Sequence, residues 1–229
     1  MLKFNPIVLI TQPRELPEAI DSVKKYVKYP KAWFKGYTEP EVTKKINQYV
    51  KETNYSHYII CADDVIVNSQ IFEDMVKYIN IFSNHKETSQ DILTGWCNLN
   101  IDPSDNSLGW ESNVAEKRLT LKNGVWPLKC DYKFSPIRDI LSRKGLIRTY
   151  LASFALSCVS RDVLMNYSLA PYMNGQAADH RFSRRVTADG IKIWTTPKMF
   201  VKHLRERSTA HLKRNWIVGK VNPTVTEEL

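Results

Sequence analysis

The sequence is poor in glycine and lacks the glycine-rich signatures of nucleotide binding. Gly accounts for 8 of 229 residues, and neither G-x-x-x-x-G-K-[ST] nor G-x-G-x-x-G occurs. The G-x-S-x-G elbow and the H-E-x-x-H zinc motif are also missing. These absences argue against a P-loop NTPase, a classical dinucleotide-binding domain, an α/β-hydrolase and a zinc metalloprotease of the H-E-x-x-H type.

Cysteine pairs and long hydrophobic runs are lacking too. The four cysteines form no C-x-x-C pair, so we expect reduced thiols in a reducing compartment. No apolar run approaches the roughly 20 residues that span a bilayer. The apolar run at 7–10 is too short for the core of a signal peptide. We therefore expect a cytoplasmic protein, with peripheral contact at the cytoplasmic membrane face left open.

The charge is strongly basic. Lys and Arg number 33 against 24 Asp and Glu, which gives a formal net charge of +9. Such an excess favours nucleic acid, an anionic membrane surface or phosphorylated small molecules as partners, and it does not choose among them. Because no RNP, zinc-finger or clear helix-turn-helix signature accompanies the charge, nucleic acid is the weakest of the three.

The first 85 residues alternate between strand and helix patterns. The predicted strands are 6–10, 32–37 and 57–64, and the predicted helices are 16–29, 39–54 and 68–83. This order predicts a parallel sheet covered by helices. Ligands bind at the carboxyl ends of strands in such sheets, where TQPR (11–14) and ADD (62–64) stand.

The remainder is less regular, and no linker divides it from the first part. Strands are predicted at 91–100, 149–160 and 191–196, a loop at 101–113, a hairpin around Asn123-Gly124, and helices after Ser160 and over 175–190, the last ended by Gly190. Residues 136–148 are basic, and their pattern fits a helix or a mobile loop. Residues 197–216 are also strongly basic.

Three acids and one histidine are candidates for chemistry. Asp63 and Asp64 end a hydrophobic strand side by side, where a divalent cation offsets their repulsion; the alternative is a solvated turn or a helix cap. Asp179 stands near the start of a predicted helix, and its alternative reading is an acid that the helix dipole favours at that position. His203 follows an apolar run, where a lone histidine is more often structural than a ligand.

Taken in order, four segments resemble the GT-A-fold glycosyltransferases, most closely those of family 2. They are PIVLITQPRELPEAIDSV, HYIICADDVIVNSQIFEDMV, FALSCVSRDVLMN and GQAADHRFSRRVTADGIKIWTTPKMFVKHL. The resemblance covers about residues 5–85 and 150–205 and implies an α/β fold with a mainly parallel central sheet flanked by helices. It implies one catalytic domain over 1–229, with a nucleotide-sugar-binding half (1–100), an acceptor-binding half (101–205) and a basic C-terminal extension (206–229).

The resemblance also implies roles for individual residues. Asp64 and His203 would hold the metal, Asp63 would support the site through ribose or water contacts, and Asp179 would be the general base. Residues bordering the nucleotide or its diphosphate would be Thr11, Gln12, Pro13, Arg14, Glu39, Arg205 and Arg207. The chain departs from the family pattern in having Ala62 before the two acids and Ala178 before Asp179.

The expected function is therefore metal-dependent sugar transfer. The donor would be a UDP- or GDP-linked sugar bound with Mn²⁺ or Mg²⁺, and the acceptor a hydroxyl on a glycan, lipid or protein. An inverting mechanism would use Asp179 as the base. The alternatives are a nucleotidyltransferase that makes nucleotide-sugars, although TQPREL lacks its usual glycine-rich loop, and a basic nucleic-acid-binding protein without catalysis.

Overall fold

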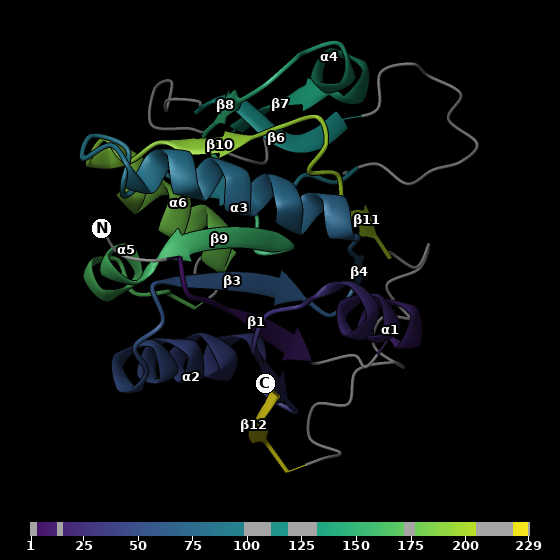
Figure 1. The fold of residues 1–229 in the computed structure, drawn as a ribbon, viewed down its shortest axis with the longest axis vertical. Helices are drawn as coiled ribbons and strands as arrows, with labels where there is room; N and C mark the ends of the chain where they lie inside the picture. The colour runs from purple at the N-terminus through teal and green to yellow at the C-terminus, as the bar shows by residue number, and fades with distance from the viewer. Residues whose placement is uncertain are drawn as a thin grey trace, which may run out of the picture.

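A large sheet with helices on both faces forms the centre of the molecule (Figure 1). The computed structural model describes residues 4–12, 16–98, 111–118, 132–171, 177–204 and 222–228. The strands are β1 (Pro6–Gln12), β2 (Lys31–Lys35), β3 (His57–Ala62), β4 (Val65–Ile66), β5 (Ile92–Thr94), β6 (Glu111–Arg118), β7 (Tyr132–Pro136), β8 (Ile147–Thr149), β9 (Leu156–Ser160), β10 (Ile193–Thr195), β11 (Lys202–His203) and β12 (Thr224–Glu228). The helices are α1 (Pro17–Tyr26), α2 (Glu39–Glu52), α3 (Ser69–Ser83), α4 (Ile137–Leu141), α5 (Arg161–Asn166) and α6 (Ala178–Ala188).

The eight strands of the central sheet are ordered β12-β2-β1-β3-β9-β5-β10-β8. β2, β1, β3, β5 and β10 share one direction, and β12, β9 and β8 run against it. The predicted α/β class with a mainly parallel central sheet is confirmed.

Strand periodicity divides the core into two layers. Along β1, Val8 and Ile10 pack on the side of α1 and α3, whereas Ile7 and Leu9 pack on the side of α2, α5 and α6. All four side chains are buried, because helices cover both faces of the sheet. This explains why the strand reads as a continuous apolar run.

Several predicted helix ends carry the expected caps. The Ile71 N–H donates to the Asn68 side chain at the start of α3, and the Val163 N–H donates to Ser160 Oγ at the start of α5. Gly190 follows the end of α6 with φ of 87°, a left-handed conformation that favours glycine. The predicted caps and the predicted stop at Gly190 are confirmed.

The predicted strand at 149–160 is wrong in its extent. Residues 147–149 form β8, residues 150–155 form an irregular segment, and only 156–160 form β9, which lies antiparallel between β3 and β5. The irregular segment contributes Leu151, Ser153 and Phe154 to the wall of a cavity. An apolar run can therefore be buried without being one continuous strand.

Other corrections concern the middle of the chain. Within the described part of the strand predicted at 91–100, only Ile92–Thr94 forms a strand, β5, and residues 136–148 contain α4 and the first two residues of β8. β6 and β7 form the antiparallel pair expected of a hairpin, with β6 starting inside the predicted loop. The Asn123-Gly124 turn lies outside the described residues.

A strand near the C-terminus completes one edge of the sheet. β12 pairs antiparallel with β2, and Glu227 accepts a hydrogen bond from the Tyr49 hydroxyl of α2. The sequence reading assigned no strand to this part of the extension. Within the described ranges, no helix has both the length and the apolar character needed to cross a membrane.

Candidate functional site

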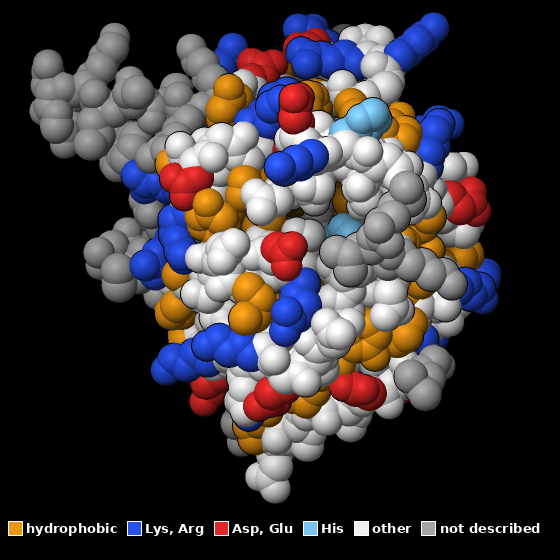
Figure 2. Space-filling view, turned by 60° about the vertical axis from the view of Figure 1, so that its left-hand side comes forward, with side chains coloured by type: hydrophobic (Ala, Val, Ile, Leu, Met, Phe, Trp, Pro, Cys, Tyr) orange, Lys and Arg blue, Asp and Glu red, His pale blue; other side chains and the backbone are white. Residues whose placement is uncertain are grey.

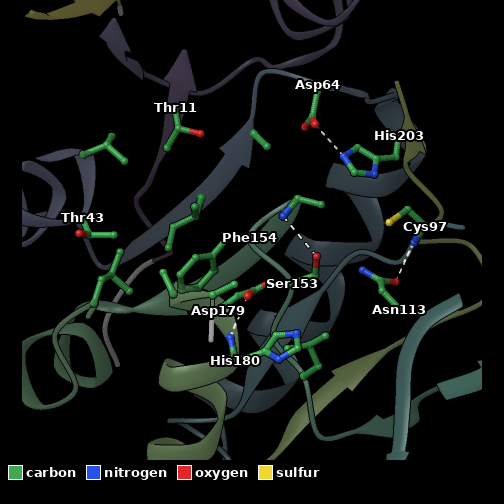
Figure 3. A pocket seen from close by; sticks show the side chains of 18 of the residues that line it. Thr11, Thr43, Asp64, Cys97, Asn113, Ser153, Phe154, Asp179, His180 and His203 are labelled. Carbon is green, nitrogen blue, oxygen red and sulfur yellow. Dashed lines mark hydrogen bonds and ion pairs between the residues drawn. The ribbon is translucent and has the colours of Figure 1, made fainter. Parts of the chain in front are cut away.

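A cavity of about 370 Å³ opens at the carboxyl ends of β1 and β3 (Figure 3). Its wall combines segments from the first and second halves of the chain. The lining residues include Thr11, Val42, Thr43, Ile46, Asp64, Cys97, Asn113, Phe134, Ser153, Phe154, Asp179, His180 and His203. Three of the four candidate residues for chemistry therefore face one space, as expected from the topology.

Asp64 and His203 form a side-chain hydrogen bond in this wall. The Asp64 Oδ2 atom lies 2.7 Å from His203 Nε2, although the two residues are 139 positions apart in the sequence. The Asp64 side chain is 5% exposed and that of His203 is 15% exposed. The pair thus sits at the edge of the cavity and is mostly shielded from water.

Two short strands bring the pair together. The chain turns at Asp63-Asp64 directly after β3, and β4 then pairs antiparallel with β11, so that His203 lies opposite Val65. The Leu204 N–H donates to the Asp64 carbonyl oxygen at 2.6 Å. The backbone of the last third is therefore fixed against the acidic turn on both sides of His203.

The two adjacent aspartates have different surroundings. Asp63 and Asp64 are both buried, at 1% and 4% exposure, and Asp64 is the one that lines the cavity. A solvated turn, the alternative reading of this pair, is wrong because neither side chain reaches solvent to any extent. The proposed supporting role of Asp63 stays a prediction.

Asp179 lies in the first turn of α6 and faces the cavity from the other half of the chain (Figure 3). Its Oδ1 atom accepts a hydrogen bond from the His180 N–H at 2.8 Å. Burial raises the pKa of this carboxyl above its usual value, although nearby His180 and backbone hydrogen bonds from His180 and Phe154 oppose the rise. A carboxylate with a raised pKa is a stronger base than an exposed one.

Polar groups from β6 and α6 complete the wall near Asp179. The Asn113 Oδ1 atom accepts a hydrogen bond from the Cys97 N–H at 2.8 Å. The ring of His180 packs edge-on against Tyr132, with 5.2 Å between ring centroids. Cys97 is buried and forms no disulfide within the described part of the chain.

The remaining predicted residues are placed to different degrees. Thr11 lines the cavity at the end of β1. Gln12 ends β1 and Glu39 begins α2, and the positions of both side chains lie outside what the structure describes. Pro13, Arg14, Arg205 and Arg207 lie outside the described residues altogether.

The Asp64–His203 pair has a donor set that suits a divalent cation. A carboxylate oxygen and an imidazole nitrogen are both ligands for Mn²⁺, and Mg²⁺ binds through one or two carboxylates with substrate phosphates completing its shell. Among the described residues, no group of three or more His, Cys, Asp or Glu side chains is arranged to hold a metal. The pair therefore fits a cation that is shared with a phosphate ligand.

Several lining residues had no signal in the sequence. Thr43 and Ile46 lie in the helix predicted at 39–54, and Asn113 lies at the end of the loop predicted at 101–113. His180 follows Asp179 directly, and no motif marked it. They come together because the order of the strands in the sheet places both halves of the chain around one cavity.

On the face of the molecule seen in Figure 2, Lys and Arg side chains are dispersed among hydrophobic and acidic groups, with a His in a hollow near the middle.

Comparison of the sequence with known proteins finds no relative. No protein-family model matches it, and neither does any curated protein. The fold, in contrast, has clear neighbours among solved structures.

Two solved structures show the likeness in fold. The structure titled A197 from STIV aligns with 88% of this chain and 86% of its own, at 10% identity and a TM-score of 0.52. GalNAc-T7, crystallised with UDP, GalNAc and Mn²⁺, aligns with 89% of this chain at 11% identity and a TM-score of 0.56, and the match spans 44% of the GalNAc-T7 chain. Together with the order of its sheet, this likeness shows that the chain has a GT-A-like fold, the fold of nucleotide-sugar transferases.

Proposed function

We propose that this protein is a metal-dependent glycosyltransferase that moves a sugar from a nucleotide-diphospho-sugar to an acceptor hydroxyl. The observation that carries the proposal is the meeting of Asp64, His203 and Asp179 around one cavity. These residues come from the turn between β3 and β4, from β11 and from α6. Ligand sites in α/β proteins lie at the carboxyl ends of parallel strands, which is where these three residues meet.

Asp64 and His203 would hold Mn²⁺ or Mg²⁺ at the donor diphosphate. When bound, the cation supplies charge neutralisation for the leaving diphosphate. Asp64 would contribute a carboxylate oxygen to this site. The hydrogen bond from the Leu204 N–H to the Asp64 carbonyl oxygen holds the Asp63-Asp64 turn in place. GalNAc-T7, whose fold is similar, was crystallised with UDP and Mn²⁺, which supports testing UDP and Mn²⁺ first.

Asp179 would act as the general base of an inverting reaction. Its carboxylate takes the proton from the acceptor hydroxyl while the oxygen attacks the anomeric carbon and the bond to the diphosphate breaks. Partial burial keeps the carboxylate basic, and hydrogen bonds from backbone N–H groups fix its orientation. General-base catalysis of this kind contributes roughly 10²–10⁴-fold to the rate.

The two halves of the cavity suggest a division of labour. Thr11, Gln12, Pro13, Arg14 and Glu39 are proposed to border the nucleotide, and Asp63 is proposed to support the site from within the acidic turn. Arg205 and Arg207 follow β11 directly and would add positive charge near the diphosphate. Residues 101–205 would bind the acceptor, which we propose is a glycan, lipid or protein hydroxyl.

The test is a thermal-stability panel with UDP-, GDP- and dTDP-sugars, with and without Mn²⁺. A ligand that binds only the folded state stabilises it by RT ln(1 + [L]/Kd), about 2.7 kcal/mol at 100 Kd. The proposal expects a shift that requires both the metal and one nucleotide and that is lost in Asp64→Ala. Pyrophosphate release from a nucleoside triphosphate and a sugar phosphate would instead identify a nucleotidyltransferase, and a metal-independent response to DNA or RNA alone would overturn both.

A further inference from the structure

Asn113 lines the cavity with an amide whose NH₂ end has no hydrogen-bond partner among the described residues. It lies on β6, is 5% exposed, and shares the cavity wall with Asp64 and Asp179. Its Nδ2 atom is buried. Leaving a buried amide unsatisfied costs about 1–3 kcal/mol, so a ligand in the cavity that accepts its hydrogen bonds would stabilise this arrangement.

The orientation of this amide is fixed by its other end. The Cys97 N–H donates to Asn113 Oδ1 at 2.8 Å, and the Asn113 N–H donates to the Cys97 carbonyl oxygen at 3.0 Å. Because a backbone N–H can only donate, the side-chain atom that faces it must be the oxygen. The NH₂ group therefore points the other way, toward the space between Ser153 and His180 (Figure 3).

The neighbouring polar groups already have partners. The Thr43 hydroxyl donates to the Pro40 carbonyl oxygen, and Ser153 Oγ accepts from the Ala155 N–H. Asp64 pairs with His203, and Asp179 accepts backbone N–H groups. Among these groups, the Asn113 amide is a neutral donor held ready for a ligand.

The chemistry of the amide selects the class of ligand atom. Two neutral N–H donors match a hydroxyl or carbonyl oxygen, whereas a phosphate or carboxylate would favour a charged partner. In the proposed reaction, the transferred sugar lies between the diphosphate at Asp64 and the base at Asp179. Asn113 lines the same cavity as both of these residues.

We infer that Asn113 is a specificity-determining residue that donates hydrogen bonds to an oxygen of the transferred sugar. This inference rests on the proposed function, and it adds the part of the donor that the residue recognises. Asn113 fixes the sugar ring relative to Asp179 rather than taking part in bond making or breaking. A donor that lacks the recognised oxygen leaves the buried NH₂ group unpaired and binds more weakly.

Two variants separate the donors from the structural role of the residue. Asn113→Asp keeps a side-chain oxygen for the Cys97 N–H and removes the two N–H donors. Asn113→Ala removes both the acceptor oxygen and the NH₂ donor group without adding a charge. The thermal stability of each free variant shows whether the bond to Cys97 is kept, and Asn113→Asp is expected to stay closer to wild type.

The experiment measures the Kd of the nucleoside diphosphate and of the matching nucleotide-sugar in Mn²⁺, by titration calorimetry. The ratio of the two constants isolates the contribution of the sugar. We expect Asn113→Ala to bind the nucleoside diphosphate like wild type, and both variants to lose about 10- to 100-fold in the ratio. Mono-deoxy donor analogues then identify the oxygen, since the analogue that lacks it binds wild type and Asn113→Ala equally.

Each remaining outcome has one meaning. If wild type gains nothing from the sugar, or if both variants keep the full ratio, the inference is overturned while the proposed function stands. A variant that keeps the ratio and loses only affinity for the acceptor also overturns it, because the recognised oxygen would then belong to the acceptor. If wild type binds no nucleotide at all, the proposed function itself fails.

Discussion

Asp64 and Asp179 face the same cavity from opposite halves of the chain, and the protein treats them differently. Asp64 Oδ2 lies 2.7 Å from His203 Nε2. Asp179 is held by backbone N–H groups, and burial raises its pKa. One acid is therefore held by a side chain from the last third of the chain, and the other by backbone groups in surroundings that favour its protonated form.

The comparison teaches that position in a fold does not by itself assign a role. Asp64 follows β3, Asp179 lies in the first turn of α6, and both line the cavity at the carboxyl ends of β1 and β3. Their partners distinguish them, because Asp64 contacts a histidine side chain and Asp179 accepts hydrogen bonds from backbone N–H groups. Each of the following experiments breaks or sharpens this contrast.

Asp64→Ala should have the largest effect. Losing a metal ligand removes several kcal/mol of charge stabilisation at the diphosphate, or about 10⁴-fold in kcat/KM. The measurement is sugar transfer together with the Kd of Mn²⁺ in the presence of nucleotide. Asp139→Ala, on the exposed face of α4, is the matched acid control and should behave as wild type. Equal turnover in Asp64→Ala would remove this residue from the site.

Asp179→Asn should follow, with about a 10³-fold loss in kcat. Asparagine keeps an oxygen for the His180 N–H but cannot take the acceptor proton. We expect the Kd of the nucleotide-sugar to remain near that of wild type, in contrast to Asp64→Ala. Steady-state kinetics and calorimetry on both variants make the comparison. A loss of donor binding without a loss of kcat would assign Asp179 to the donor and not to the base.

The raised pKa of Asp179 has opposite consequences for activity and stability. Activity should fall as the pH drops through this raised pKa, because the base becomes protonated. Between the ordinary and the raised pKa the folded state binds more protons than the unfolded state, so the free energy of unfolding falls as the pH rises. At pH 7, Asp179→Asn should thus be more stable than wild type, and each kcal/mol gained raises Tm by about 2–4 °C.

Thermal scans from pH 4 to 8 check this expectation. The gain of Asp179→Asn over wild type should shrink toward low pH, where the wild-type carboxyl is itself protonated. A constant difference at all pH values would point to packing and not to ionisation.

Gly190→Ala should have the smallest effect. Gly190 follows the end of α6 that is remote from Asp179, and an added Cβ would meet no atom within 4 Å. Its φ of 87° still makes any other residue cost about 1–2 kcal/mol. We expect a lower Tm with kcat unchanged within about twofold of wild type. Gly145→Ala, with a similar φ of 75° in the segment before β8, is the control for strain elsewhere in the fold. A large loss of kcat in Gly190→Ala alone would show that the far end of α6 positions the base.

The sequence predicted the fold well where local pattern decides it. β1, α1, β2, α2, β3 and α3 were found in order and nearly in place, because buried runs such as 6–10 and capping residues such as Asn68 act within a few positions; the two-residue strand β4 was missed. β9 was found as an apolar run, but its direction was not. Direction depends on which strands it separates, β3 and β5, and these contacts are not local.

The site was predictable only in part, for the same reason. The resemblance indicated Asp64, Asp179 and His203, and the structure gathers them around one cavity. Nothing local indicated Asn113, since its significance depends on a hydrogen bond from Cys97 and on its burial. A residue that matters through an unused donor leaves no pattern in the sequence.

The pairing of β4 with β11 has a consequence for how the protein is made. Asp64 leaves the ribosome 139 residues before His203, which at 5–20 residues per second is an interval on the order of ten seconds. During that time the strand–helix units of the first half can fold, but the acidic turn has no partner from β11. The Asp64–His203 contact is therefore among the last features to assemble, and a nascent or truncated chain that stops before residue 203 carries the carboxylate without its histidine neighbour.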